Sequence, residues 1–526
     1  MKGIVLLGCA GWLFCGASFA ASEAARQDPK FSVLEYQVEG NTMLPEVRIE
    51  EAVYPFLGEG KTIADVERAR VALEQAYRDA GYLTVLVDIP EQSVNGGVVQ
   101  LKVVEGSIEK VRVTGSRYFD RDRILSRVPE LAQGSVPYFP AVQRQLADAN
   151  QMADLKVTPL LSPGKNRGTV EAELRVEDKL PAHASVELNN YASANTTSTR
   201  LVGQVRYDNL WQRGHSLSMQ AQTTPQNTSQ VKVFSGTYSM PMRGNQLALY
   251  AVVSRSMVPI QTDMTMVGHG NILGARYVMP LRGGEKLFHN LALGVDYKDF
   301  KDDSFLAGAN TGHTPISYLP FSLAYNATLL HEDSVTQANV AANFHLRGVG
   351  DKMTICNGQV VSQFECKRFN AQANYFYLRG GVDHTLNLTS GMSLFGRVDG
   401  QIASGPLVSN EQFTAGGADS VRGYYESEQA GDDGLHGSVE LRSPQWAKNN
   451  VNDLHALAFV DAAHLRVREP LPAQTARFDL SSVGLGLRLQ AWNDFILRLD
   501  LAWPLKTTVS TPGGKPHLSV KTSLSL

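Results

Sequence analysis

The chain has 526 residues, which is more than one compact soluble core usually holds, so several domains are expected. Its formal net charge is −3, so its composition gives it no general attraction to nucleic acid. Hydrophobic residues make up 43% of the chain, yet no apolar run beyond the N-terminus is long enough to form a transmembrane helix.

The N-terminus has the three parts of a secretory signal peptide. Lys2 supplies the basic region, residues 3–14 form a mostly apolar core, and Ser18-Phe19-Ala20 is a small-x-small cleavage site. A buried N-terminal helix and a lipoprotein box ending at Cys9 are the alternatives, and the apolar core before Cys9 is too short for the second. We therefore expect residues 1–20 to be removed on export, which leaves residues 21–31 as a short tail.

Two of the four cysteines, Cys9 and Cys15, leave with the signal peptide. The mature chain keeps Cys356 and Cys366, which lie close together around Asn357-Gly358. In an exported chain this arrangement predicts a local disulfide that staples a loop, with two free thiols as the alternative. No histidine or further cysteine lies in this stretch of the sequence, so we expect no metal site, and no cofactor is predicted.

Residues 32–108 and 109–180 read as two small α/β modules of similar length and element order, which is an internal repeat. In the first module Val66, Leu73 and Tyr77 fall on one face at helical spacing. The elements expected in the first module are a strand at 32–38, a helix at 63–80 and strands at 83–89 and 98–104. Those of the second are a strand at 108–113, helices at 120–127 and 139–152, and strands at 155–161 and 169–176.

From residue 181 to residue 526 the helical period gives way to strands that alternate apolar and polar residues. Between residues 494 and 503, for example, Phe495 and Trp503 face one way, whereas Arg498 and Asp500 face the other. A membrane β-barrel with a wet lumen needs one apolar and one polar face on each strand. A soluble β-sandwich also alternates, but its dry core would exclude the charges that recur here on the inner phase. We therefore expect a mainly-β fold, in which a roughly 16-stranded transmembrane barrel follows two α/β domains.

Short motifs within the two modules resemble a known family. Tyr77–Tyr82, Pro90–Gln92 and Val103–Gly106 resemble, in order, the first POTRA domain of two-partner secretion outer-membrane transporters, of the haemolysin secretion and activation type. Leu160–Gly164 resembles the matching strand turn of a second POTRA domain. The resemblance runs over nearly the whole mature chain and implies two periplasmic POTRA domains before an outer-membrane barrel. The final Leu526 departs from the family, whose barrels usually end in an aromatic residue.

A glycine-rich stretch resembles the long loop of the same superfamily. Residues 405–434 connect the eleventh and twelfth expected strands, and three motifs follow one another along them in the family's order. These motifs are Glu411–Phe413, Gly416–Tyr424 and Gly431–Gly434. The resemblance implies that the loop folds back into the barrel lumen. Glycines allow a sharp turn there because they accept positive φ at little steric cost.

Within this loop, the resemblance implies a lock between Val421, Arg422, Gly423 and Tyr424 and a later strand, where Asp461 would receive the arginine. Asp461 is expected to face the lumen, because the opposite phase of its strand is apolar. Arginine is permanently charged, and its planar fork matches a carboxylate at two points. An exposed loop arginine is the alternative.

The resemblance also implies a function, which is export of one large β-helical exoprotein, of haemolysin or adhesin type, from the periplasm to the cell surface. The POTRA domains would bind the client's secretion domain, because an extended segment can add as a strand to an exposed sheet edge. The sequence contains no P-loop pattern, no HExxH motif and no convincing nucleophile triad, so we expect a transporter that uses no ATP and is not an enzyme. Outer-membrane lipid is the other expected partner, nucleic acid is not one, and a monomer is expected.

Three other functions share parts of this pattern. An assembly factor for other barrels usually carries more POTRA domains, and a passive porin needs no N-terminal modules. A lipase barrel needs a Ser/His/Asp set facing lipid, and neither His455 nor His464 stands in a convincing serine motif. Many relatives carry an N-terminal helix that plugs the pore. Here only the tail at 21–31 precedes the first strand, so we expect either no plug or closure by the loop alone.

Overall fold

The computed structural model describes residues 29–526 apart from residues 95, 195, 259–266, 302, 307, 308, 314, 357, 447–450 and 493. The signal peptide expected at 1–20 and most of the tail expected at 21–31 lie outside the described residues. The chain divides between Lys179 and Leu180 into two compact units, which we describe separately. Among the described residues, no helix is both long and apolar enough to cross a membrane.

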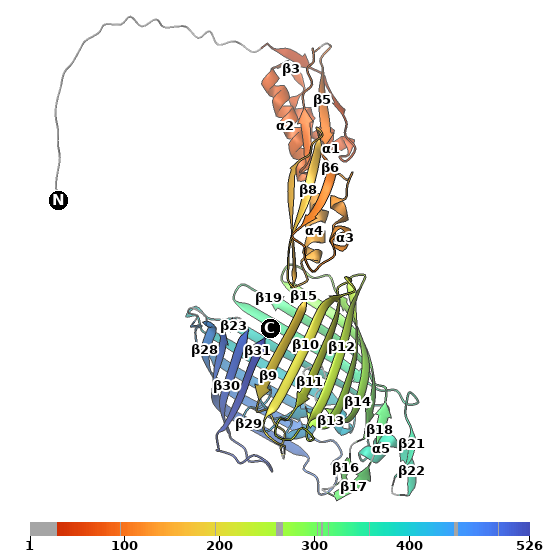
Figure 1. The fold of residues 1–526 in the computed structure, drawn as a ribbon, viewed down its shortest axis with the longest axis vertical. Coiled ribbons are helices and arrows are strands. Elements are labelled where there is room, and N and C mark those ends of the chain that lie inside the picture. The colour runs from red at the N-terminus through yellow and green to blue at the C-terminus, as the bar shows by residue number, and fades with distance from the viewer. Residues whose placement is uncertain are drawn as a thin grey trace, which may run out of the picture. The chain divides into compact units, whose positions relative to one another are not determined.

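The first unit contains two modules that share the order strand, two helices, two strands, and the first module adds the short strands β1 and β3 (Figure 1). In each, a three-stranded sheet has a central strand that pairs parallel with the module's earlier strand and antiparallel with the third. The first module consists of β1 (Phe31–Val33), β2 (Glu35–Glu39), α1 (Glu46–Val53), a 3-10 turn (Tyr54–Phe56), β3 (Gly58–Lys61), α2 (Ile63–Asp79), β4 (Val85–Asp88) and β5 (Val98–Glu105). The second consists of β6 (Ser107–Thr114), α3 (Arg121–Arg127), a 3-10 turn (Pro129–Leu131), α4 (Phe139–Ala149), β7 (Leu155–Pro163) and β8 (Thr169–Asp178).

Helix α2 corresponds to the helix expected at 63–80. Its buried face carries Val66, Ala69, Leu73 and Tyr77 at the spacing seen in the sequence. Its N-terminus is held by a capping box in which Thr62 and the third helical residue bond reciprocally. Helix α1 was not expected from the sequence. Only two of its residues are buried, which is too few for a recognisable helical period.

Two boundaries differ from the sequence expectation. Strand β6 begins at Ser107, so Ser107 and Ile108, which the sequence assigned to the first module, belong to the sheet of the second module. Helix α4 ends at Ala149 instead of 152, because the amide side chain of Asn150 bonds the backbone of β7. Its Nδ2 donates to the Val157 carbonyl at 3.1 Å, and the Val157 N–H donates back to Oδ1 at 2.7 Å.

Glu105 connects the three elements at one end of the first module. Its carboxylate accepts the backbone N–H groups of Thr42 and Met43 at 2.7 and 2.8 Å, which closes the turn before α1. The buried hydroxyl of Tyr77 donates to it at 3.4 Å from α2. Burial and the nearby carboxylate raise the pKa of Tyr77, so this hydroxyl stays protonated and able to donate. The motif residues Tyr77 and Glu105 therefore act together to hold the turn before α1 against helix α2.

In the described part of the second unit, sixteen long antiparallel strands close into a barrel in which β31 lies beside β9 (Figure 1). These strands are β9 (Ala182–Asn189), β10 (Arg200–Leu210), β11 (His215–Thr223), β12 (Lys232–Met242), β13 (Asn245–Val258), β14 (Val267–Pro280), β15 (Leu287–Phe300), β19 (Phe321–Leu330), β20 (Ser334–Phe344), β23 (Phe376–Asn387), β24 (Ser393–Ala403), β27 (Asp433–Arg442), β28 (Val451–Arg466), β29 (Arg477–Ala491), β30 (Phe495–Pro504) and β31 (His517–Ser525). The expected fold class is confirmed, because a mainly-β barrel follows two α/β modules.

Shorter elements occupy the connections between these strands. They are β16 (Asp303–Leu306), β17 (Ala309–His313), β18 (Ile316–Tyr318), β21 (Met353–Cys356), β22 (Gln359–Ser362), α5 (Gln363–Lys367), a 3-10 turn (Ser409–Glu411), β25 (Phe413–Ala415) and β26 (Gln429–Gly431). Strand β18 pairs with the end of β15 just before β19 takes over that edge. We call the end of the barrel at which β9 begins the proximal rim, and the opposite end the distal rim.

The strands present the two faces expected of a barrel in lipid. On β27 and β28, Val439 and Val460 point outward, and each is 54% exposed. The residues of the opposite phase, including Ser438, Glu440 and Asp461, are buried on the inside of the barrel. Because side chains alternate strictly along a strand, this phase determines which groups can meet a segment that enters the lumen.

We predict that Glu105→Ala loosens the turn before α1 without unfolding the module. Loss of hydrogen bonds to a charged acceptor costs roughly 1.5–3 kcal/mol, so the Thr42 and Met43 amides should exchange roughly ten- to a hundredfold faster. Hydrogen–deuterium exchange on the intact protein measures this. Glu50→Ala on the exposed face of α1 is the matched control and should leave both amides at the wild-type rate. Unchanged exchange in Glu105→Ala would contradict the assignment.

Candidate functional site

The connection between β24 and β27 enters the barrel from the distal rim. Its two legs pair as a short antiparallel ladder, because β25 lies against β26 with Phe413 opposite Gly431. Between these strands, residues 416–428 form the tip of the loop. Gly416 and Gly417 begin the tip with φ values of +108° and +110°, which a residue with a side chain rarely adopts.

Arg422 projects from this tip onto the inner wall of the barrel and is only 4% exposed. Its Nε and Nη2 donate to the two carboxylate oxygens of Asp461 on β28, each at 2.7 Å. The backbone N–H of Arg422 also donates to Asp461 Oδ2, at 3.1 Å. The structure therefore brings together the arginine and the aspartate that the sequence had paired, in the two-point geometry that fixes orientation as well as adding energy.

Three further side chains of the wall hold the same guanidinium. Its Nη1 donates to Glu440 Oε1 at 2.7 Å, and its Nη2 donates to Ser438 Oγ at 3.1 Å. The guanidinium carbon lies 3.4 Å from the ring centroid of Phe459, which supplies a cation–π contact from beneath. The sequence reasoning missed Glu440 and Ser438 as partners. Both stood on the polar face of their strand, but only the register of β27 against β28 places them beside Asp461.

The charges around Arg422 balance. Arg442 donates to Glu440 at 2.6 Å, and Arg488 donates to Asp500 at 2.8 Å. Asp500 also lies 3.7 Å from Arg422. Three guanidinium groups thus face three carboxylates, counting Asp461, so each buried charge has a partner of opposite sign.

The residues next to Arg422 fit the tip against neighbouring strands. Val421 is fully buried in an apolar cluster with Leu465 of β28 and Leu480 of β29. The Tyr424 hydroxyl lies within hydrogen-bond distance of the Ser481 and Lys506 carbonyl oxygens, at 3.0 and 2.9 Å. Gly423 has φ of +93°, and an added Cβ would lie 3.1 Å from Pro504 and from Ala502. Each residue of the motif therefore has its own contact.

The first leg of the loop carries a buried carboxylate to which the sequence reasoning gave no role. Glu411 accepts Lys298 Nζ of β15 and the Tyr318 hydroxyl, each at 2.6 Å, and the Tyr377 hydroxyl at 2.8 Å. Glu411 belonged to one of the motifs recognised in the sequence. Its partners lie more than thirty positions away, on strands whose register no local pattern reveals.

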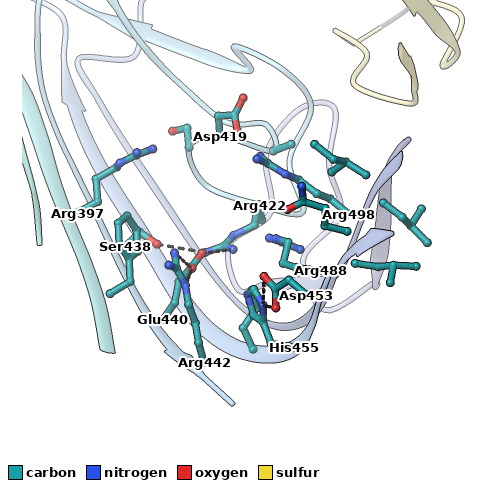
Figure 2. Close-up of a pocket in the computed structure, with 18 of the residues that line it drawn as sticks. Arg397, Asp419, Arg422, Ser438, Glu440, Arg442, Asp453, His455, Arg488 and Arg498 are labelled. Atoms are coloured by element: carbon teal, nitrogen blue, oxygen red, sulfur yellow. Dashed lines mark hydrogen bonds and ion pairs between the residues drawn. The ribbon is translucent and has the colours of Figure 1, made fainter. Parts of the chain in front are cut away.

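A polar cavity of about 370 Å³ lies beside Arg422 in the lumen. Figure 2 shows Arg422 pointing toward Ser438 and Glu440, with Arg488 and Arg498 on the other side of the cavity. Within either unit taken alone, the described residues bring no three histidine, cysteine or acidic side chains into metal-ligand spacing.

The two mature cysteines form the disulfide expected from the sequence. Cys356 ends β21 and Cys366 lies in α5, both in the connection between β20 and β23 at the distal rim. The bridge joins the β21–β22 hairpin to the helix that follows it. The hairpin and this helix lie side by side in Figure 1.

Comparison with known families decides the class of protein. The family model described as haemolysin secretion/activation protein ShlB/FhaC/HecB matches residues 168–489, which is more than half of the chain. The chain belongs to this family. A POTRA domain model of the ShlB type matches residues 31–106. The protein is therefore an outer-membrane translocator of two-partner secretion, with a POTRA module on the periplasmic side and an exported protein as its client.

Curated relatives agree with this class, and a solved structure has the same fold. The chain is 22% identical over 466 residues to the outer membrane transporter CdiB of Dickeya dadantii, covering 84% of this chain and 78% of that protein. It is 21% identical over 404 residues to the hemolysin transporter protein HpmB of Proteus mirabilis, covering 76% and 69%. The solved structure of CdiB from Escherichia coli has the same fold, with a TM-score of 0.62, 18% identity and coverage of 96% and 92%. In this translocator the proximal rim is periplasmic and the distal rim lies at the cell surface.

We predict that Arg422→Ala and Asp461→Ala are coupled. Each single change strands a buried opposite charge, so the double variant should cost about 1–3 kcal/mol less than the sum of the two. Hydrogen–deuterium exchange of residues 416–425 measures the stability of the docked tip in all four proteins. Fully additive effects would show that the two side chains do not interact in solution.

We also predict that Gly423→Ala weakens docking of the tip. The new methyl group enters the space beside Ala502. The backbone at residue 423 also has a positive φ, which costs about 1–3 kcal/mol in a residue other than glycine. Gly405→Ala is the matched control, since its Cβ meets no atom within 4 Å. Exchange of residues 416–425 should rise in the first variant alone. An equal rise in both would remove the steric explanation.

Proposed function

We propose that the loop at 405–434 closes the pore of the translocator and that Arg422 and Asp461 hold it closed. The observation that supports this most directly is the nearly complete burial of Arg422 on the inner wall. A segment fixed there occupies the lumen through which a client must pass. A surface loop with no role in closure would gain nothing from a carboxylate, a hydroxyl and an aromatic ring arranged around one guanidinium.

We further propose that arrival of the client releases this lock. Removal of Arg422 from the wall leaves Asp461 without its cationic partner, whereas Glu440 keeps Arg442. In a dry interior a buried carboxylate left unpaired costs roughly 3–5 kcal/mol. Water in the lumen lowers that cost, because freed carboxylates become hydrated. Contacts of the client with the wall can supply the remainder. We infer that export needs no ATP and that folding of the client outside the cell draws it through. We also propose that the protein acts as a monomer and catalyses no reaction itself.

The two modules, proposed as POTRA domains at 32–108 and 109–180, are the proposed binding sites for the client's secretion domain. In each three-stranded sheet the central strand is hydrogen-bonded to a neighbour along both of its edges, so only the two outer strands have a free edge. In the second module these are β6 and β7, with 8 and 9 residues. An extended client segment can bond to such an edge through its backbone, and pockets for alternate side chains then select the sequence.

The names of the relatives suggest the kind of client. HpmB is a hemolysin transporter, and CdiB is an outer membrane transporter. We propose that this protein exports a large β-helical exoprotein of haemolysin or adhesin type. The reading frame beside its gene is the first place to look for that client.

We predict that Arg422→Ala lowers export of the client about tenfold or more while the barrel stays folded. A loss of even 1.4 kcal/mol from the docked tip shifts its population tenfold toward undocked positions. A client that reaches the lumen then meets a tip in no defined position, so the ordered release that export requires is lost. The measurement is the amount of client at the cell surface, with heat-modifiable migration as the test for a folded barrel. Arg477→Ala at an exposed end of β29 is the matched control and should export normally. Normal export by a folded Arg422→Ala protein would overturn the proposed lock.

A further inference from the structure

Asp432 stands at the end of the second leg of the loop and is completely buried. Its carboxylate accepts the backbone N–H of Leu407 at 2.8 Å and that of Arg468 at 2.7 Å. The side chain of Gln412 donates to it at 3.2 Å. Leu407 and Gln412 belong to the first leg, so one carboxylate ties the two legs of the loop together.

Arg368 neutralises this buried carboxylate. Its Nη1 and Nη2 donate to the two oxygens of Asp432, the second at 2.6 Å. Nη1 also donates to the Leu407 carbonyl oxygen of the first leg, and Nη2 donates to the Arg468 carbonyl oxygen at 3.2 Å. A single guanidinium therefore contacts both legs and the connection between β28 and β29. Arg368 was not singled out in the sequence, because no motif surrounds it.

The segment that carries Arg368 is itself fixed to the distal rim. Helix α5 ends at Lys367, immediately before Arg368. Phe364 of α5 is fully buried against the Tyr318 ring, and the Gln363 side chain bonds the backbone of Ser317 at 3.0 and 2.7 Å. The Cys356–Cys366 disulfide joins α5 to the β21–β22 hairpin. Arg368 thus extends from a packed and cross-linked part of the surface.

The contacts of the legs and those of the tip involve different parts of the barrel. Arg422 bonds Asp461, Glu440 and Ser438, which are inward-facing residues of β27 and β28. The side-chain contacts of the Asp432 carboxylate lie among connections at the distal rim and include none of these side chains. Each set of contacts can therefore be removed by a substitution that deletes no contact of the other set.

We propose that Arg368 is a positioning residue for the loop. With Asp432 it holds both legs at the cell-surface rim as a fixed hinge, and the disulfide-linked helix α5 keeps Arg368 in place. The inference rests on the proposed function, because a hinge matters only if the tip leaves the lumen. The tip moves when Arg422 dissociates from Asp461, whereas the legs stay bound at the rim. The attached legs then guide Arg422 back to the same position on the barrel wall.

The test is hydrogen–deuterium exchange of the full-length protein, with peptides from the legs (405–412 and 429–433) compared with the tip (416–425). In Arg368→Gln the legs should exchange roughly a hundredfold faster, because Asp432 is left as an unpaired buried charge. Arg368→Lys keeps the charge but not the two-point geometry, and it should restore part of the protection. In Arg422→Ala only the tip should exchange faster. Arg347→Gln, an exposed arginine of the same connection, is the matched control.

Two results would overturn the hinge. One is wild-type protection of the legs in Arg368→Gln. The other is equal loss of protection in legs and tip in Arg422→Ala, since the loop would then move as one unit. If Arg368→Gln gives no folded barrel, reduction of the wild-type disulfide decides instead. Faster exchange in the legs supports the hinge, and unchanged legs overturn it. Normal export by Arg422→Ala would overturn the proposed lock but not the hinge, because the hinge is tested by hydrogen–deuterium exchange of the leg peptides and not by export.

Discussion

The buried ion pair between Arg422 and Asp461 is the interaction on which the rest of the site depends. A charge inside a barrel is tolerated only with a partner, and here each carboxylate around the arginine is paired in turn. The loop legs, the glycines of the tip and the inward phase of β27 and β28 all serve to bring one guanidinium to one carboxylate. The proposed closure of the translocator rests on the same constraint, because under that proposal the docked loop must leave the lumen before a client can pass.

The sequence was sufficient for the fold class because periodicity changes so clearly along it. Helical spacing marked α2, and strict alternation marked β27, β28 and β30. Asp461 could be assigned to the lumen from the phase of its own strand. Its partner Arg422 came from resemblance to a family, since nothing local joins a loop residue to a strand some forty positions later.

Other parts could not be read from the sequence for physical reasons. Helix α1 buries two residues, too few to give a period. Glu440 and Ser438 reach Arg422 only because β27 and β28 pair in one particular register, which no local sequence pattern reveals. Arg368 and Asp432 belong to two different connections of the rim, and such long-range pairs carry no local signal. Charged residues in connections are usually solvated, so their burial could only emerge from the structure.

The completeness with which Asp461 is buried has a consequence for the environment in which the protein works. An outer-membrane protein meets whatever solution surrounds the cell, from dilute water to concentrated brine. At moderate ionic strength, dissolved ions largely screen exposed charges that lie more than about 10 Å apart, and they screen buried pairs much less. With its carboxylate fully enclosed, the contact that holds the tip in place is insulated from the salt outside. The docked tip should therefore stay in place as the salt concentration of the medium changes.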